Sequence, residues 1–178
     1  MGDSLDDLLC LSRADITTKR PEKKRRGLRQ ISDLADRVET AVRFAAEVKD
    51  FDPGDYIERK EIKRTDRFAQ FAIAGAVQAM REAGLDENTG GLDPDRFGVI
   101  IGSGIGGIAT FEEQHGRFVA KGPGRVSPFF VPMFIGDIAA GLVSIRYGAK
   151  GPNYATVSAC ASGAHAIGSA MRSIQVGE

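Results

Sequence analysis

The segment Val157 to Gly163, with the sequence VSACASG, constrains the fold of this chain more than any other feature. The residues just before it, Asn153 to Val157, have the length and composition of a short buried strand. After it, small and apolar residues recur at helical spacing: Ala164, Ile167, Gly168, Met171 and Ile174. The pattern therefore predicts that Cys160 lies at a sharp turn from a strand into a helix.

A cysteine in that position has the surroundings of a nucleophile. The start of a helix presents free N–H groups and a partial positive charge, which favour a thiolate over a thiol. The same N–H groups can hold a developing oxyanion. The alternative interpretation is structural: Cys160, between Ala159 and Ala161, would be a small buried apolar side chain.

Composition places the chain among soluble globular proteins. Its 178 residues suffice for one domain with a core, and 42% are hydrophobic while 27% are charged. A formal net charge of zero gives no overall field that would attract nucleic acid or a membrane surface. No apolar run approaches the roughly 18 residues of a membrane helix. The chain has two cysteines, Cys10 and Cys160, and its start lacks the apolar core of a signal peptide. Both observations predict a reduced, cytoplasmic location.

Periodicity and capping residues predict the remaining elements. Asp66 is expected to cap a helix from Arg67 to Ala83 that ends at Gly84. Its expected apolar face consists of Phe68, Phe71, Ala72, Gly75, Ala76 and Met80. A strand is predicted at Phe97 to Ile101 and a helix at Ile108 to Ala120. An irregular, proline-punctuated segment is predicted from Lys121 to Pro132, and a helix from Met133 to Tyr147 that ends at Gly148.

Three further motifs precede the cysteine motif. They are IGSGIGG at 101–107, SPFFVPM at 127–133 and GAKGPN at 148–153, followed by SACASGAHAIG at 158–168. The glycine spacing of the first fits neither a dinucleotide-binding nor a P-loop pattern, so a nucleotide site is rejected. In this order, the four motifs resemble the N-terminal half of the beta-ketoacyl-acyl-carrier-protein synthases, closest to the elongating type II condensing enzymes. The resemblance runs from about Phe44 to the end of the chain.

The resemblance implies a thiolase-like, layered α/β/α fold, here an incomplete N-terminal half without its first strand and without the C-terminal half. Cys160 would take an acyl group from the phosphopantetheine of an acyl carrier protein, and the complete enzyme would then condense it with malonyl carrier. The condensation step of the family uses two histidines and a lysine of the C-terminal half. His165 lies about 140° around the helix from Cys160, so it is not expected to assist. The chain alone is therefore expected to be inactive in condensation.

The resemblance also implies roles for further residues. Ile105, Phe130 and Ala159 match positions of the acyl pocket, with Ile105 at the gate. Docking of the carrier protein is implied for Lys60, Lys63, Arg64 and Arg125, although Gly124 stands where the family often has another cation. The implied partners are acyl carrier protein and, in the complete enzyme, a second copy in a homodimer; nucleic acid, membrane, cofactor and metal are not expected.

Each of these roles has an alternative that the residues alone leave open. Ile105 can simply close a glycine turn, and the cations can form an ordinary solvated face. A thiolase, a chain-initiating synthase or a polyketide ketosynthase shares the turn at Cys160. A non-catalytic protein that binds a longer synthase or the carrier is the alternative from another functional class.

Residues 1–43 form a divergent segment with a different character from 44–178. Acidic residues at its start pass into a basic run from Lys19 to Arg29, and Ile31, Leu34, Val38 and Val42 could form one helical stretch. The family begins instead with an apolar strand, so an altered reading of the N-terminus is one hypothesis and a genuine extension is the other. The basic run lacks interleaved aromatic residues, which argues against a nucleic-acid arm.

Overall fold

The computed structural model describes residues 48–85, 89 and 91–178. The chain divides into two units, Met1–Asp50 and Phe51–Glu178, and the elements described lie in the second. The predictions for residues 1–43 lie outside the described residues. Among the residues described, no helix is long and apolar enough to cross a membrane.

Two short parallel strands form the sheet of this unit. Strand β1 (Val99–Gly102) pairs in register with β2 (Asn153–Thr156), so that Val99 lies opposite Asn153 and Gly102 opposite Thr156. Both predicted strands are confirmed, although β1 begins two residues later than expected. The prediction that β2 is buried was wrong, because Asn153 and Tyr154 are exposed. Among the described residues β2 has a neighbouring strand on one edge alone, which leaves its first half open to solvent.

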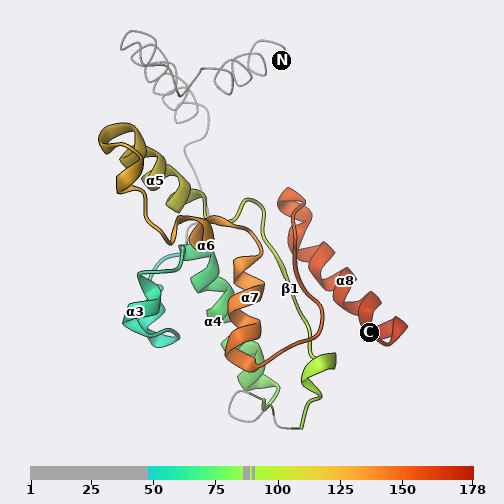
Figure 1. The fold of residues 1–178 in the computed structure, drawn as a ribbon. Helices are drawn as coiled ribbons and strands as arrows, with labels where there is room; N and C mark the ends of the chain where they lie inside the picture. The colour runs from blue at the N-terminus through green and yellow to red at the C-terminus, as the bar shows by residue number, and fades with distance from the viewer. Residues whose placement is uncertain (1–47, 86–88, 90) are drawn as a thin grey trace, which may run out of the picture. The chain divides into compact units, whose positions relative to one another are not determined.

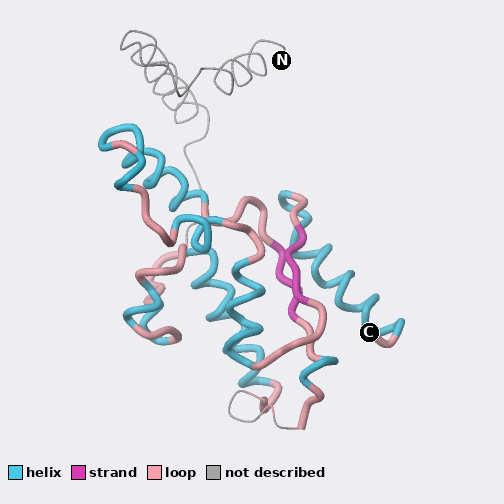
Figure 2. Tube along the Cα trace, in the orientation of Figure 1, coloured by secondary structure: helices cyan, strands magenta, loops and turns pink. Residues whose placement is uncertain are grey.

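Helices cover both faces of the two strands. Helices α4 (Arg67–Glu82) and α7 (Ile138–Tyr147) pack against each other, and α7 packs against both strands. Helix α8 (Ser162–Val176) also packs against both strands, and Figure 1 shows it on the side of β1 away from α7. Figure 2 shows how short the strands are beside the helices that flank them. The predicted α/β/α layering is thus confirmed for this unit.

The core lies between α4, α7 and β1. Its buried side chains are Ile57, Ile73, Val77, Val99, Ala140, Val143 and Tyr147. The predicted apolar face of α4 was partly right. Ala76 and Met80 are half-buried against the core, but the fully buried stripe is Ala69, Gln70, Ile73, Ala74 and Val77, and Gly75 is exposed. Both stripes follow helical periodicity, so packing against α7 decides which of them is buried.

Helix ends follow the predicted capping chemistry. The side chain of Asp66 accepts a hydrogen bond from the N–H of Phe68 at the start of α4, and Gly84 follows the helix with φ +70°. Gly148 ends α7 in the left-handed conformation with φ +68°. Helix α5 (Ile108–Lys121) agrees with the prediction within one residue and ends at Gly122.

The charged segment before α4 and the proline-rich segment after α5 contain short helices. Helix α3 spans Arg59–Ile62. The segment predicted as irregular holds a 3-10 helix at Pro123–Arg125 and the start of α6 (Phe130–Phe134). Prolines are tolerated there because the first turn of a helix leaves N–H groups unpaired in any case. The predicted helix from Met133 is accordingly split into α6 and α7, with Ile135 in extended conformation between them.

Candidate functional site

Cys160 lies at the turn between β2 and α8. A single 3-10 turn, Ala159–Ala161, joins the strand to the helix, and Ser162 begins α8. The thiol of Cys160 is free and the residue is exposed. The structure therefore contradicts the alternative that Cys160 is a buried apolar side chain. We call residues 157–162 the cysteine elbow.

Ala159 holds an uncommon backbone conformation in the cysteine elbow. Its φ is +48°, and among the described residues Asp50 is the other non-glycine with positive φ. The left-handed region is disfavoured for a residue with a Cβ and persists where surrounding contacts enforce it. Ala159, predicted in the acyl pocket, is thus the residue at which the chain turns toward Cys160.

The glycine turn after β1, residues 102–107, contacts the cysteine elbow. The N–H of Ser103 donates to the carbonyl of Thr156 at 3.1 Å. A Cβ placed on Gly104 would lie 3.8 Å from the carbonyl oxygen of Ala159. Ile105, the predicted gate of the acyl channel, lies in this turn and is 66% exposed. The fold therefore brings the segment that carries Ile105 beside the segment that carries Cys160.

The same glycine turn also packs against α6, where Phe130 is the first residue. The N–H of Gly107 donates to the carbonyl of Phe134 at 2.9 Å. Phe130 is half-buried in an aromatic cluster, with ring centroids 6.2 Å from Phe111 and 5.6 Å from Phe134. The three predicted pocket residues thus lie on segments joined through one glycine turn.

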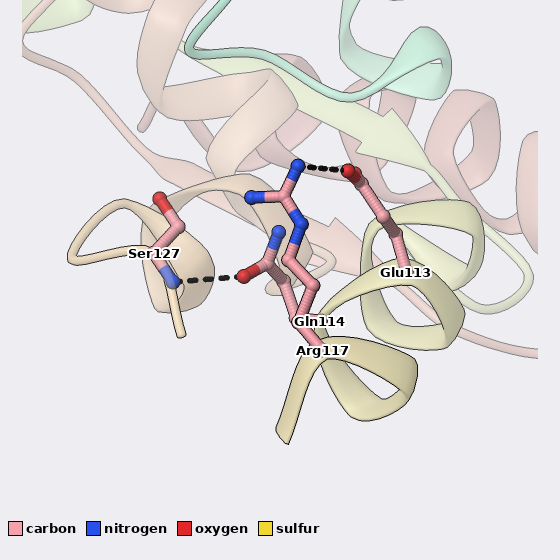
Figure 3. A network of polar contacts seen from close by, with 4 residues as sticks. All are labelled: Glu113, Gln114, Arg117 and Ser127. Carbon is pink, nitrogen blue, oxygen red and sulfur yellow. Dashed lines mark hydrogen bonds and ion pairs between the residues drawn. The ribbon is translucent and has the colours of Figure 1, made fainter. Parts of the chain in front are cut away.

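A network of polar contacts fastens the segment between α5 and α6 (Figure 3). The side-chain oxygen of Gln114 accepts a hydrogen bond from the N–H of Ser127 at 2.8 Å, and Gln114 is 4% exposed. One turn further along α5, Arg117 pairs with Glu113. Gln114 therefore holds the chain three residues before Phe130.

All four predicted docking residues are exposed. Lys60 lies on α3 and forms a solvent-exposed ion pair with Glu58 at 3.2 Å. The guanidinium of Arg64 lies 4.8 Å from the ring centroid of Phe129, next to Phe130. Lys63 follows α3, and Arg125 closes the 3-10 helix that precedes Phe129 in the chain. The cation–π contact of Arg64 brings the segment after α3 to the segment that carries Arg125 and Phe130.

Sequence reasoning missed two sets of polar contacts, one at the cysteine elbow and one at the start of α5. Nδ1 of His165 lies 2.6 Å from the hydroxyl of Ser158, so the hydrogen bond of the ring goes to Ser158. Buried Asp66 binds the N–H and the hydroxyl of Thr110 at 2.9 and 2.6 Å, in addition to capping α4. Ser158 and His165 both belong to the motif SACASGAH, but only the observed turn brings their side chains together. Within the described ranges, no group of three His, Cys, Asp or Glu side chains is arranged to hold a metal ion.

Comparison with known proteins places this geometry in a family. The family model described as "Beta-ketoacyl synthase, N-terminal domain" matches residues 2–178, a range that begins well before Phe44. The 3-oxoacyl-[acyl-carrier-protein] synthase 2 of Staphylococcus aureus is 52% identical over 151 residues, covering 82% of this chain and 36% of the relative. The protein of the same name from Synechocystis sp. is 49% identical over 142 residues, covering 80% of this chain and 34% of the relative.

A solved structure agrees with the sequence relatives. A type II PKS ketosynthase, solved in complex with its acyl-carrier protein and bound to the hexaketide, is similar with a TM-score of 0.68 at 25% identity. The match covers 73% of this chain and 37% of that chain. The chain thus spans roughly a third of the length of the relatives that it matches.

Proposed function

The chain belongs to the beta-ketoacyl synthase family, whose N-terminal domain it matches over residues 2–178, and we propose on this basis that it performs the acyl-transfer chemistry of a 3-oxoacyl-acyl-carrier-protein synthase. The substrate class is an acyl thioester carried on the phosphopantetheine arm of an acyl carrier protein. The observation that carries the proposal is the free, exposed Cys160 at the turn into α8. A reducing, cytoplasmic location suits a working thiol.

In the proposed first step, the thiolate of Cys160 attacks the thioester carbonyl. A new carbon–sulfur bond forms to Cys160 and the bond to the carrier's sulfur breaks. The phosphopantetheine sulfur leaves as a thiolate, which takes up a proton from the solvent. Thiolates suit this exchange because nucleophile and leaving group are sulfur species of similar stability. Backbone N–H groups at the start of α8 are the expected partners of the oxyanion that develops.

The acyl chain is proposed to lie along Ile105, Phe130 and Ala159. Support comes from the glycine turn, which contacts both the cysteine elbow and α6 and so brings these segments together. Ile105 is exposed and the aromatic cluster around Phe130 is apolar, so both can accept a hydrocarbon chain. An acyl chain that is bound to Cys160 and extends in this direction would replace contacts with water by apolar contacts.

The carrier protein is proposed to dock on Lys60, Lys63, Arg64 and Arg125. All four are exposed, and Arg64 contacts the ring of Phe129 beside the proposed pocket. A similar ketosynthase has been solved in complex with its acyl-carrier protein, which supports a carrier as the partner class. Exposed charges of this kind mainly steer and orient an acidic partner, so we expect their effect in the rate of association.

The experiment that tests the first step is a single-turnover discharge of acyl carrier thioester by the 178-residue chain. We expect free carrier to appear in proportion to the protein, and we expect Cys160→Ala to abolish this burst. Lys63→Glu with Arg125→Glu should slow the reaction about tenfold at low ionic strength and less at high salt. Lys150→Glu, an exposed cation outside the proposed patch, is the matched control. A burst of equal size in Cys160→Ala would refute the proposal.

The second half-reaction, decarboxylative condensation with malonyl carrier, is proposed for the complete enzyme, which is also proposed to be a homodimer. The histidines of this chain are His115, stacked on Phe111, and His165, bonded to Ser158. Neither contact offers the pair of donors that an enolate requires. We therefore expect no condensation product from this chain alone. Product above the level of Cys160→Ala would contradict that expectation.

A second candidate function is non-catalytic binding to a longer synthase or to the carrier protein. The exposed apolar face of α8, with Ile167, Met171 and Ile174, favours it because such a face is suited to a protein partner. Co-purification with a longer ketosynthase, together with an absent discharge burst, would favour this candidate. A burst that depends on Cys160 would favour the enzyme.

A further inference from the structure

The backbone of the cysteine elbow is strained, so contacts around it must hold it in this conformation. Ala159 precedes the nucleophile with φ +48°, a conformation in which its Cβ crowds the following carbonyl. Residues in such conformations cost free energy and relax unless their surroundings fix them. Because Cys160 directly follows Ala159, any relaxation of this residue would redirect the thiol.

The hydroxyl of Ser162 holds the backbone on both sides of Ala159. It accepts a hydrogen bond from the N–H of Ser158 at 2.9 Å and donates one to the carbonyl of Ala159 at 2.7 Å. One oxygen atom thus joins the residue before the strained position to the strained residue itself. Ser162 is 3% exposed, so water does not readily replace either bond.

Ser162 is in turn fixed by both strands. Its carbonyl accepts a hydrogen bond from the hydroxyl of Thr156 at 2.7 Å, at the end of β2. At the end of β1, Gly102 approaches so closely that a Cβ there would lie 2.4 Å from the carbonyl carbon of Ser162. The hydroxyl of Ser162 is therefore a rigid point, positioned by the sheet, from which the elbow can be held.

We propose that Ser162 is a positioning residue for Cys160: its buried hydroxyl holds the strained backbone of Ala159 and thereby orients the thiol. The inference deepens the proposed function, and its functional consequence rests on that function. Ser162 acts through the backbone of Ser158 and Ala159. The hydrogen bond between His165 and the side chain of Ser158 is a second, more exposed contact that holds the same segment.

The first test measures the conformation of the elbow without reference to activity. In amide hydrogen exchange, Ser162→Ala should speed exchange of the Ser158 amide about tenfold or more, because that N–H loses its buried acceptor. Ser162→Thr retains the hydroxyl and should stay close to the parent chain. Ser173→Ala is the matched control, because Ser173 lies on the same helix and bonds Glu178 at the far end.

The second test compares two reactions of Cys160. A model acyl thioester of N-acetylcysteamine needs an oriented thiol, whereas iodoacetamide needs mainly an accessible one. The ratio of the two rates, followed on the peptide that contains Cys160, should fall about tenfold in Ser162→Ala. It should remain within about twofold in Ser162→Thr and Ser173→Ala. General loss of folding would be recognised in the first test, because it would speed amide exchange throughout the described unit and not at Ser158 alone.

The outcomes separate the inference from the proposed function. If Ser162→Ala matches Ser173→Ala in both exchange and rate ratio, the inference is wrong even if Cys160 transfers acyl groups. If the parent chain shows no thioester transfer, the proposed function fails, and the exchange result alone decides whether Ser162 holds the elbow. Faster exchange at Ser158 with an unchanged rate ratio would contradict the functional role of Ser162.

Discussion

Gly102 shows how a single residue without a side chain fixes the geometry around Cys160. A glycine after a strand suggests a phosphate-binding turn or a conformational hinge. In the structure the reason is steric: the backbone of β1 passes the first turn of α8 so closely that there is no room for a Cβ. The close approach brings the strand end, Ser162 and the cysteine elbow into one packed unit.

Gly102→Ala should therefore destabilise the fold by about 3 kcal/mol or more, because the new methyl group meets backbone atoms that cannot rotate away. Gly75→Ala is the matched control, since Gly75 lies exposed within α4 and a Cβ there meets nothing within 4 Å. That substitution should stabilise by about 0.5–1 kcal/mol, as expected for glycine in a helix. Urea unfolding of the two variants measures both values, and equal effects would contradict the packing described.

At this scale, sequence reasoning located the thiol but not the hydrogen bonds that hold the backbone around it. The position of Cys160 followed from local patterns, a strand before it and a helix after it. The roles of Ser162 and His165 did not, because their hydrogen bonds depend on the conformation of Ala159. A positive φ at an alanine has no signal in residue type, since glycine and asparagine are the residues that usually mark it.

At the scale of elements, Asp66 joins two helices that are distant in sequence. One carboxylate oxygen caps α4 through the N–H of Phe68, and the other binds Thr110 in the first turn of α5. Asp66 is 7% exposed, so both sets of bonds are shielded from water. The start of α5 is thereby held beside the start of α4, and with it the glycine turn that carries Ile105.

Asp66→Ala should cost about 3 kcal/mol, because it removes charge-assisted hydrogen bonds and leaves the hydroxyl of Thr110 buried without its acceptor. Asp93→Ala serves as control: Asp93 caps an exposed 3-10 helix through the N–H of Asp95. We expect a loss of about 1 kcal/mol there. The free energy of unfolding in urea distinguishes the two, and a similar small loss in both would show that the link to Thr110 contributes little.

Gln114 should hold the segment before Phe130 in a comparable way. Gln114→Ala removes the acceptor of the Ser127 N–H, and we expect amide exchange in residues 126–130 to rise about tenfold. Gln78→Ala is the control, because Gln78 is exposed and bonds the hydroxyl of Tyr56. Unchanged exchange at Ser127 in Gln114→Ala would mean that other contacts fix this segment.

The elements themselves were largely predictable, while their orientations were less so. Capping by Asp66 and termination at Gly84 and Gly148 set the ends of α4 and α7, because these residues act locally. Which face of α4 is buried depended on packing against α7, which no local pattern reports. The break between α6 and α7 was missed, although Gly136 and the N-cap residue Asp137 stand there and are residue types that often separate two helices.

For the described unit as a whole, the dominant surface feature is the outer face of α8. Ile167 is 73% exposed, Met171 57% and Ile174 79%, in a row at helical spacing. These are residues whose periodicity predicted the helix, and within this chain they are exposed. Nearby in sequence, Tyr154 and Val157 are exposed as well. Exposed apolar side chains in a row on one helix favour association.

The 178-residue chain should therefore self-associate at micromolar concentration, because the described unit exposes an edge of its sheet and an apolar helix face together. Ile167→Glu combined with Ile174→Glu should reduce the association, because charge on α8 opposes contact between apolar faces. Ile145→Glu, at a residue 80% exposed on α7, is the matched control. Sedimentation velocity over a concentration series measures the effect, and a parent chain that remains monomeric throughout would count against the role of α8.

The layered arrangement of the unit was expected from the resemblance rather than from periodicity. Local patterns gave strands and helices in alternation, but the parallel register of β1 and β2 and the placement of α7 and α8 on separate faces are tertiary features. Motif order carried that information, because it indicated a family and with it that family's fold. The proposed pocket and docking residues have the same basis, and for the docking residues Lys63→Glu with Arg125→Glu supplies a direct test.

The central claim is that the sulfur of Cys160 receives the acyl group. Locating that group by tandem mass spectrometry tests the claim most directly. The chain is exposed once to an acyl carrier thioester, digested and sequenced. We predict the acyl mass on the sulfur of Cys160. Its attachment to Ser158, whose hydroxyl is bonded to His165, or to Cys10 would contradict the account. So would an unmodified chain in which Cys160 still reacts with iodoacetamide.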